Sequence, residues 1–343
     1  MNKKLLYFNL AVDENDTSLG FAIKWIEKIS EEYEHVDVIT LRKDSDTIFS
    51  NSVNIYGPRK NSRRLYKYIY FYKTLKHLLK SNTYERCFSH MSPISIVIGY
   101  YLLSKNKIKT TLWFTHPGPK FGVKKIILFL SMLASESIVT ASRNSFPFNS
   151  HKVNVIGHAI DLKNFTHKKE KLKYENFLIL SRISRSKNLE IAIESFLNSK
   201  FKESKLDIVG GTLNEKDEIY LNELKKAYPQ DNVNFLGKVE YRKLPELLKN
   251  YDIHFNCAQN GFFDKSVLET LSSQIINFYR NEDFNLFFND DFFKFQDVED
   301  LTHKLNELSQ MSIEETSIYF DNLKTKLEMN SLSTLNQRLK NYL

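Results

Sequence analysis

The chain has 343 residues, more than one hydrophobic core usually holds, and this length predicts two domains. Its 42% hydrophobic and 26% charged residues and net charge of +8 are those of a folded globular protein, which excludes a disordered chain. Cys87 and Cys257 are the only cysteines, so a disulfide framework and a cysteine zinc site are also excluded.

The positive charge is concentrated in one part of the first half. Residues 51–135 hold fifteen Lys and Arg and one acid, Glu85. The densest part, residues 57–80, reads GPRKNSRRLYKYIYFYKTLKHLLK and mixes cations with tyrosines. Such a segment attracts phosphate on an anionic membrane surface, an anionic substrate or a nucleic acid, although a solvated basic helix face has the same composition.

No apolar run reaches the length of a membrane span. The longest, residues 92–104 and 123–134, fall short of the ~20 residues that a crossing helix needs. The apolar run near the N-terminus is short, contains Asn9 and ends in acids, so we expect a buried strand there rather than a signal peptide.

Strands alternate with helical patterns along the first half. The segment GFAIKWIEKISEEY at 20–33 is one such helical pattern. The alternation predicts a parallel sheet with helices on both faces. The expected strands are residues 5–10, 36–40, 53–56, 87–89, 111–114, 137–140 and 153–156.

A polar, lysine-rich stretch at 161–176 interrupts this rhythm, and the pattern then restarts. The tail is expected to be mostly helical. Two Rossmann-like domains in tandem are therefore predicted, with ligands at the carboxyl ends of the strands. The expected strands of the second half are residues 177–180, 206–209, 233–236, 253–256 and 276–279.

A cationic turn without glycine stands out at residues 177–196, FLILSRISRSKNLEIAIESF. The apolar residues after Asn188 recur at helix spacing, so we expect a helix that begins near Lys187 with its N–H groups pointing into the turn. Arg182 at the strand end and Lys187 at the helix start predict a diphosphate site. Ordinary surface cations are the alternative.

The order of several motifs resembles that of family 4 glycosyltransferases. Arg182–x4–Lys187 is followed by LDIVGG at 206–211, VNFLGKV at 233–239 and YDIHFNCAQNGFFDKSVLETLSS at 251–273. The first half adds TLWFTHPG at 111–118, SESIVTAS at 135–142 and KVNVIGHAID at 152–161. The resemblance implies an α/β protein of GT-B fold, with two Rossmann-like domains that face each other across a cleft.

Three segments are then expected. Residues 1–165 would form the acceptor-side domain and residues 172–325 the nucleotide-sugar-binding domain. A C-terminal helix in residues 326–343 would return to the first domain.

In the resembling enzymes the Arg and Lys of the turn bind the donor's diphosphate and stabilise charge on the leaving group. The resemblance also implies that Glu269 binds the ribose hydroxyls. Asp264 either touches a sugar hydroxyl or caps the next helix. The expected donor-binding residues are Arg182, Lys187, Gly210, Val239, Gly261, Phe262, Phe263, Asp264, Lys265 and Glu269.

The resemblance further implies that His116 contacts the donor sugar and joins Arg182 and Lys187 as the catalytic set, with a structural histidine as the alternative. The acceptor-side residues are expected to be Ser18, Gly20 and His90. No metal or other cofactor is expected, because cations and helix ends replace the divalent ion.

Departures from the family pattern leave the sugar and the degree of activity open. Gly261 stands where the family often has a second Glu. Gln274 and Ile276 stand where a Gly and a Pro usually follow the helix, and the turn after Leu10 lacks the usual paired glycines.

The sequence thus predicts a metal-independent retaining glycosyltransferase that moves a sugar from a UDP- or GDP-linked donor to a glycan, expected to be lipid-linked, in cell-surface polysaccharide biosynthesis. We expect a cytoplasmic protein, peripheral on the inner face of the membrane through residues 57–80, with no nucleic acid partner. The alternatives are an inactive GT-B scaffold and a nucleic-acid-binding module that uses the same segment.

Overall fold

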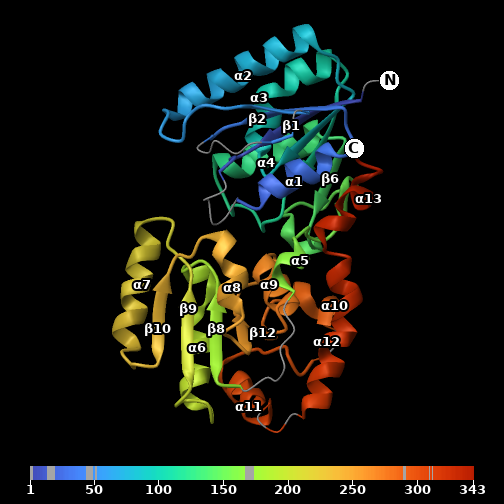
Figure 1. Ribbon diagram of the computed structural model, residues 1–343. Coiled ribbons are helices and arrows are strands. Elements are labelled where there is room, and N and C mark those ends of the chain that lie inside the picture. The colour runs from blue at the N-terminus through green and yellow to red at the C-terminus, as the bar shows by residue number, and fades with distance from the viewer. Residues whose placement is uncertain are drawn as a thin grey trace. The chain divides into compact units, whose positions relative to one another are not determined.

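The computed structural model describes residues 3–13, 20–43, 49–50, 52–166, 174–288, 291–308, 310 and 312–343 (Figure 1). The chain divides into two compact units. The first comprises Met1–Ala159 with Leu332–Leu343, and the second comprises Ile160–Ser331.

A parallel sheet forms the centre of the first unit. In its inner strand β1, four successive residues are fully buried, as expected of a strand that helices cover on both faces: Leu5, Leu6, Tyr7 and Phe8. The strand order is β3-β2-β1-β4-β5-β6-β7. The bounds are β1 (Lys4–Asn9), β2 (His35–Thr40), β3 (Val53–Tyr56), β4 (Arg86–His90), β5 (Lys109–Trp113), β6 (Ser137–Thr140) and β7 (Val153–Val155).

Helices α2 (Arg64–Ser81), α3 (Pro93–Lys105) and α4 (Val123–Ala134) pack side by side on one face of this sheet. Phe71 of α2 meets Phe8 edge to face, with ring centroids 4.8 Å apart. The crossover through α1 (Ala22–Ser30) runs in the opposite direction along the sheet, so a right-handed connection places α1 on the other face.

The second unit also has a parallel sheet, in the order β10-β9-β8-β11-β12. Its strands are β8 (Asn176–Leu180), β9 (Lys205–Val209), β10 (Val233–Gly237), β11 (Ile253–Asn256) and β12 (Ile276–Tyr279). Its helices are α5 (Leu162–Phe165), α6 (Leu189–Asn198), α7 (Glu215–Ala227), α8 (Leu244–Leu248), α9 (Lys265–Ser272), α10 (Asn285–Phe288), α11 (Val298–Leu308) and α12 (Ile313–Glu328).

The last twelve residues belong to the first unit and pack against α1 through α13 (Leu335–Leu339). Arg338 Nη1 donates to the backbone carbonyls of Ile156 and His158, the latter at 2.6 Å. The Asn336 side chain donates to the Lys28 carbonyl at 2.7 Å. These bonds fix the end of the chain beside the first sheet.

The predicted α/β class is confirmed, because each expected strand falls on a strand of one of the two parallel sheets. Among the residues that the structure describes, no helix has both the length and the apolar character that a bilayer crossing requires.

Candidate functional site

The strand order of the second unit reverses between β8 and β11, and loops that follow such neighbouring strands meet at the carboxyl edge of the sheet. Arg182 and Lys187 follow β8, whereas Gly261 to Lys265 follow β11. The structure therefore brings together the two segments that the sequence singled out.

Gly210, at the end of β9, allows close approach to the turn after β8. A Cβ atom at this position would lie 1.7 Å from the carbonyl oxygen of Ser181. The Gly210 N–H donates to the Gly237 carbonyl at 2.9 Å. Any side chain at residue 210 would therefore displace the turn that carries Arg182.

The helix after this turn begins later than predicted. Residues Arg185–Lys187 form one turn of 3-10 helix, and Asn188 is left-handed with φ 46° before α6 begins at Leu189. The Leu189 N–H donates to the Tyr220 hydroxyl at 3.0 Å. The expectation that the helix N–H groups point into the turn is wrong for this first amide, because a tyrosine from α7 binds it.

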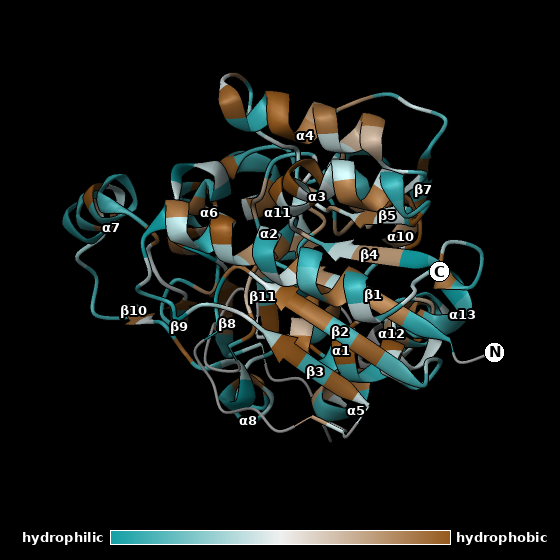
Figure 2. Ribbon diagram, turned by 90° about the horizontal axis from the view of Figure 1, so that it is seen from above, coloured by the Kyte–Doolittle hydropathy of each residue, from teal (hydrophilic) through white to brown (hydrophobic). Residues whose placement is uncertain are grey.

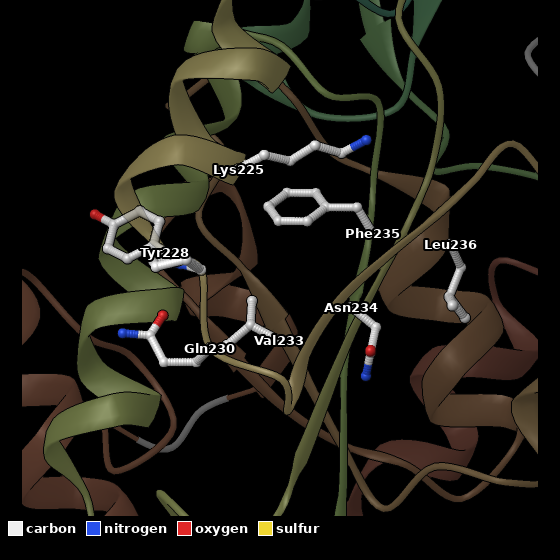
Figure 3. A pocket seen from close by; sticks show the side chains of 8 residues that line it. Lys225, Tyr228, Gln230, Val233, Asn234, Phe235 and Leu236 are labelled. Atoms are coloured by element: carbon white, nitrogen blue, oxygen red, sulfur yellow. The ribbon is translucent and has the colours of Figure 1, made fainter.

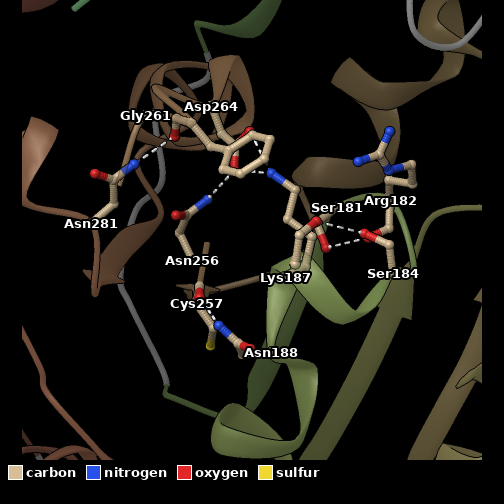
Figure 4. A network of polar contacts seen from close by, with 12 residues as sticks. Ser181, Arg182, Ser184, Lys187, Asn188, Asn256, Cys257, Gly261, Asp264 and Asn281 are labelled. Carbon is tan, nitrogen blue, oxygen red and sulfur yellow. Dashed lines mark hydrogen bonds and ion pairs between the residues drawn. The ribbon is translucent and has the colours of Figure 1, made fainter. Parts of the chain in front are cut away.

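Lys187 is buried and lies beside Asp264 (Figure 4). Its Nζ is 2.7 and 2.6 Å from the two carboxylate oxygens of Asp264. The Asn256 amide donates to the same carboxylate at 3.0 Å. This chain of contacts fixes the ammonium group between the loops that follow β8 and β11.

The Asp264 side chain points toward Lys187 and does not cap the next helix. It occupies the N-cap position of α9 but makes no capping bond with its side chain. Its carboxylate binds Lys187 instead, which corrects the capping alternative. The motif did not single out Asn256, because its contact with Asp264 depends on how the loop after β11 folds back onto the end of that strand.

Glu269 lies on α9 and is only 1% exposed. Lys265 Nζ is 3.9 Å from its Oε1 and 4.4 Å from the centroid of the Tyr241 ring. The Tyr241 side chain also lies near the Glu269 carboxylate. Burial raises the pKa of Glu269, which Lys265 and Tyr241 partly oppose.

Arg182 and Arg185 differ in their surroundings although they are three residues apart. Arg182 is half-buried, and its Nε has no hydrogen-bond partner within the described part of the chain. Figure 4 shows its guanidinium directed away from Lys187. Arg185 is exposed, pairs with Glu223 and lies 5.2 Å from the centroid of the Tyr220 ring.

The aromatic residues of the loop have different surroundings. The Phe262 ring lies under Lys187, with Nζ 4.6 Å from its centroid. Phe263 stacks on Phe284 with centroids 4.4 Å apart. Phe262 therefore borders the cation, whereas Phe263 anchors the loop to the core.

Gly261 and Val239 complete the predicted donor set. The Gly261 N–H donates to the Asp283 carboxylate at 2.5 Å, which fixes the loop where the family often has a glutamate. Val239 is partly buried against a core cluster of the second unit. Asp283 carried no sequence signal, because it lies outside every motif.

His116 lies in the first unit, in the loop after β5. Its ring Nδ1 accepts from the Gly118 N–H at 2.9 Å, and the His116 backbone N–H donates to the Ser145 carbonyl at 2.8 Å. Gly118 has φ +77°, and a Cβ there would lie 2.7 Å from Pro147 Cγ. A neutral His116 ring therefore carries its proton on Nε2.

His90 is fully buried at the end of β4, beside the rings of Trp25 and Trp113. Burial and the nearby His158 lower its pKa to about 3. The predicted acceptor-side role gains no support from this burial. Gly20 is buried before α1, and Ser18 lies outside the described residues.

A surface pocket of about 360 Å³ lies elsewhere in the second unit, between α7 and β10 (Figure 3). Lys225 extends over the Phe235 ring there, with Nζ 5.9 Å from the centroid. None of its lining residues belongs to the predicted site. Within the described ranges, no group of three or more His, Cys, Asp and Glu side chains is arranged to hold a metal ion.

Solved structures share the fold over nearly the whole chain. Anabaena Alr3699/HepE in complex with UDP-glucose is 12% identical, with 98% of each chain covered and a TM-score of 0.76. Sucrose-phosphate synthase from Thermosynechococcus elongatus is 13% identical over 99% of this chain and 98% of its own, with a TM-score of 0.78.

The lipopolysaccharide outer core galactosyltransferase WaaB is 12% identical over 99% of this chain and all of its own, with a TM-score of 0.65. No curated protein sequence matches the chain. At such identities these likenesses concern the fold, and they confirm the predicted GT-B class.

Residues 162–317 match the family described as "Glycosyl transferases group 1". This range includes the Arg182–Lys187 turn, the Gly261–Lys265 loop and Glu269, and the sheets around it have the GT-B fold. Residues 162–317 of the chain therefore belong to the group 1 glycosyl transferases.

Proposed function

We propose that the protein transfers a sugar, with retention of anomeric configuration, from a UDP- or GDP-sugar to a glycan acceptor. The observation that carries the proposal is that the turn with Arg182 and Lys187 and the loop and helix that lead to buried Glu269 follow neighbouring strands at the switch point of the second sheet. Two cations suit a diphosphate and a carboxylate suits ribose hydroxyls. The similar Anabaena protein in complex with UDP-glucose supports the donor class.

In this proposal the bond between the sugar C1 and the diphosphate oxygen breaks while the acceptor hydroxyl oxygen bonds to C1. The acceptor's proton passes to the departing phosphate oxygen. Arg182 and Lys187 stabilise the negative charge that develops there, which typically contributes on the order of a hundredfold in rate for each group. No divalent cation is required, because these side chains supply the positive charge.

His116 has a separate proposed role in this reaction. Its Nδ1 is occupied by the Gly118 N–H, so Nε2–H is the group that can donate to a hydroxyl of the donor sugar. We assign this role on the geometry of the loop and on the place of the motif.

The acceptor is proposed to be a lipid-linked glycan of cell-surface polysaccharide, with the protein on the cytoplasmic face of the membrane. Residues 51–135 contain fifteen Lys and Arg and one acid, and this excess of positive charge supports binding to an anionic membrane surface. Lipopolysaccharide galactosyltransferase WaaB, of the same fold, supports the acceptor class.

A thermal-shift screen against UDP-, GDP- and CMP-sugars tests the donor. We expect a UDP- or GDP-sugar to raise the melting temperature of the wild type but not of Arg182→Ala or Glu269→Ala. Arg185→Ala is the matched control, because this exposed arginine of the same turn should retain the shift. An unchanged shift in Arg182→Ala and Glu269→Ala would remove the site assignment.

Nucleotide release in the presence of candidate glycans separates an enzyme from an inactive scaffold. We expect release that depends on the acceptor and is lost in Lys187→Met. Donor binding without nucleotide release, whichever acceptor is added, would instead support the scaffold.

A further inference from the structure

Helix α4 of the first unit has apolar residues on two opposite faces. Leu128 and Met132 are buried against the unit, together with Ser131. Large apolar side chains also occupy its outer face and the residue pair before it, where Phe121 is 86% exposed. The exposed set is Phe121, Val123, Ile126, Phe129, Leu130 and Leu133.

This concentration is unusual for the molecule. Six of the twenty exposed large hydrophobic residues in the described part of the chain fall within residues 121–133. Figure 2 shows the brown, hydrophobic stretches of α4. A contiguous apolar face of this kind normally marks a binding surface, whereas single exposed residues do not.

Charges near α4 indicate what covers this face. Lys120, Lys124 and Lys125 stand at its N-terminal end, and residues 126–135 carry no charge. From residue 86 to residue 135 the sequence contains no Asp or Glu. Lysines around an apolar helix face complement an anionic bilayer, whose acyl chains accept the apolar side chains while its headgroups attract the cations.

A second copy of the chain fits less well. Two α4 faces packed together would bring the lysine clusters of both copies close to each other, with no acidic residue from this region to offset their repulsion. Helix α2 fits insertion less well too, since Lys67 lies among its exposed apolar residues and Arg63 and Arg64 directly precede them.

We propose that the outer face of α4 inserts into an anionic phospholipid bilayer and that residues 57–80 add only electrostatic attraction. The inference rests on the proposed function, which it deepens by naming the contact with the membrane. The loop of His116 leads directly to Phe121 and α4, so insertion would hold this loop close to a lipid-linked acceptor.

Vesicle sedimentation with the full chain tests the proposal. Vesicles of phosphatidylcholine with about one third phosphatidylglycerol are compared with pure phosphatidylcholine, and Ile126→Glu is compared with Ile219→Glu. Both isoleucines are exposed on helices, at 58% and 52%, and both changes add one negative charge. We expect Ile126→Glu to reduce partitioning to the anionic vesicles at least tenfold and Ile219→Glu to reduce it less than twofold.

A fluorescent label tests insertion directly. The two native cysteines are buried, so an environment-sensitive dye will react with Leu130→Cys, and with Leu213→Cys as the control. We expect the dye at residue 130 alone to shift to the blue on anionic vesicles.

Equal partitioning of the two glutamate variants, or no spectral change at residue 130, would overturn the proposal. So would a dimer in sedimentation velocity that Ile126→Glu dissociates. The thermal shift by the donor sugar is measured on every variant. If the wild type shows the thermal shift but binds anionic and neutral vesicles equally, only the membrane contact is removed. If the wild type shows no thermal shift, the proposed function is removed.

Discussion

Glu269 is a residue at which burial lowers stability, although its carboxylate is proposed to bind the donor. Its carboxylate is buried beside Tyr241 and Lys265, and burial is the main reason that its pKa is raised. The folded chain therefore retains this proton to a higher pH than the unfolded chain. The contribution of Glu269 to stability is present below its ordinary pKa of 4.5 and is lost as the pH rises through the raised value.

We predict that Glu269→Gln becomes more stable relative to the wild type as the pH rises from 4.5 to 8, while it loses donor binding. Urea unfolding followed by circular dichroism at both pH values measures this difference. Glu315→Gln is the control, since that glutamate is exposed and its pKa is lowered by the Ser312 backbone. A stability difference that does not change with pH would contradict the assigned cause.

His90 has the opposite pH dependence. Its pKa is lowered to about 3, chiefly by burial, so the unfolded chain binds this proton at a higher pH than the folded chain. The full contribution of His90 to stability is present above its ordinary pKa of 6.5 and is lost as the pH falls toward 3. Between pH 6.5 and 5 this loss is about 2 kcal/mol.

We predict that the first unit of His90→Phe loses much less stability on acidification than the first unit of the wild type. Trp25 and Trp113, the only tryptophans, belong to that unit, so their fluorescence during urea unfolding at pH 7 and pH 5 reports it. His254→Phe is the matched control, because His254 is buried in the second unit with a pKa of about 4. An unchanged pH dependence in His90→Phe would contradict the prediction.

At the residue scale, sequence reasoning located the cations and the acid but not their partners. Arg182, Lys187 and Glu269 follow from motif order and spacing. Asn256 and Asp283 do not, because their contacts depend on how the loop after β11 folds. The burial of His90 likewise depends on the rings of Trp25 and Trp113, which come from α1 and β5.

At the element scale, the turn between β8 and α6 depends on close backbone approach. Gly210 leaves no space for a Cβ atom beside the Ser181 carbonyl, and left-handed Asn188 delays the helix. Apolar periodicity predicted α6 but not its start, since the spacing of buried residues carries no information about a left-handed residue or about Tyr220.

We predict that Gly210→Ala lowers stability by about 2 kcal/mol or more and abolishes the thermal shift by the donor sugar, because the turn must move. Gly237→Ala is the matched control. It also has positive φ, at 75°, but no atom lies within 4 Å of its added Cβ, so strain of about 1 kcal/mol is the expected cost. Equal effects of the two changes would contradict the close-contact argument.

At the scale of the whole molecule, the chain ends by returning to its first unit. Burial lowers the pKa of Arg338 to about 10, and its guanidinium binds carbonyls in the segment before the second unit. The sequence predicted both sheets from alternating patterns, because parallel strands buried on both faces are nearly continuous apolar runs. The contacts of the C-terminal residues depend on tertiary packing, for which the sequence pattern gives no residue pairs.

We predict that Arg338→Gln lowers the stability of the first unit by about 2 kcal/mol, since two partly buried carbonyls lose a charged donor. Tryptophan fluorescence during urea unfolding measures the change. Arg242→Gln, which alters an exposed arginine of the second unit, should leave the tryptophan transition unchanged. Stability of the first unit that is equal in both variants would contradict the role of the returning segment.

The central claim is that Arg182 and Lys187 bind the diphosphate of the donor. Calorimetric titration of the wild type, Arg182→Ala and Arg185→Ala with a nucleoside diphosphate and with the matching nucleoside tests it most directly. The account predicts that Arg182→Ala weakens binding of the nucleoside diphosphate at least tenfold and leaves nucleoside binding unchanged. Arg185→Ala should bind both ligands as the wild type does. Equal weakening for diphosphate and nucleoside, or none for either, would contradict it.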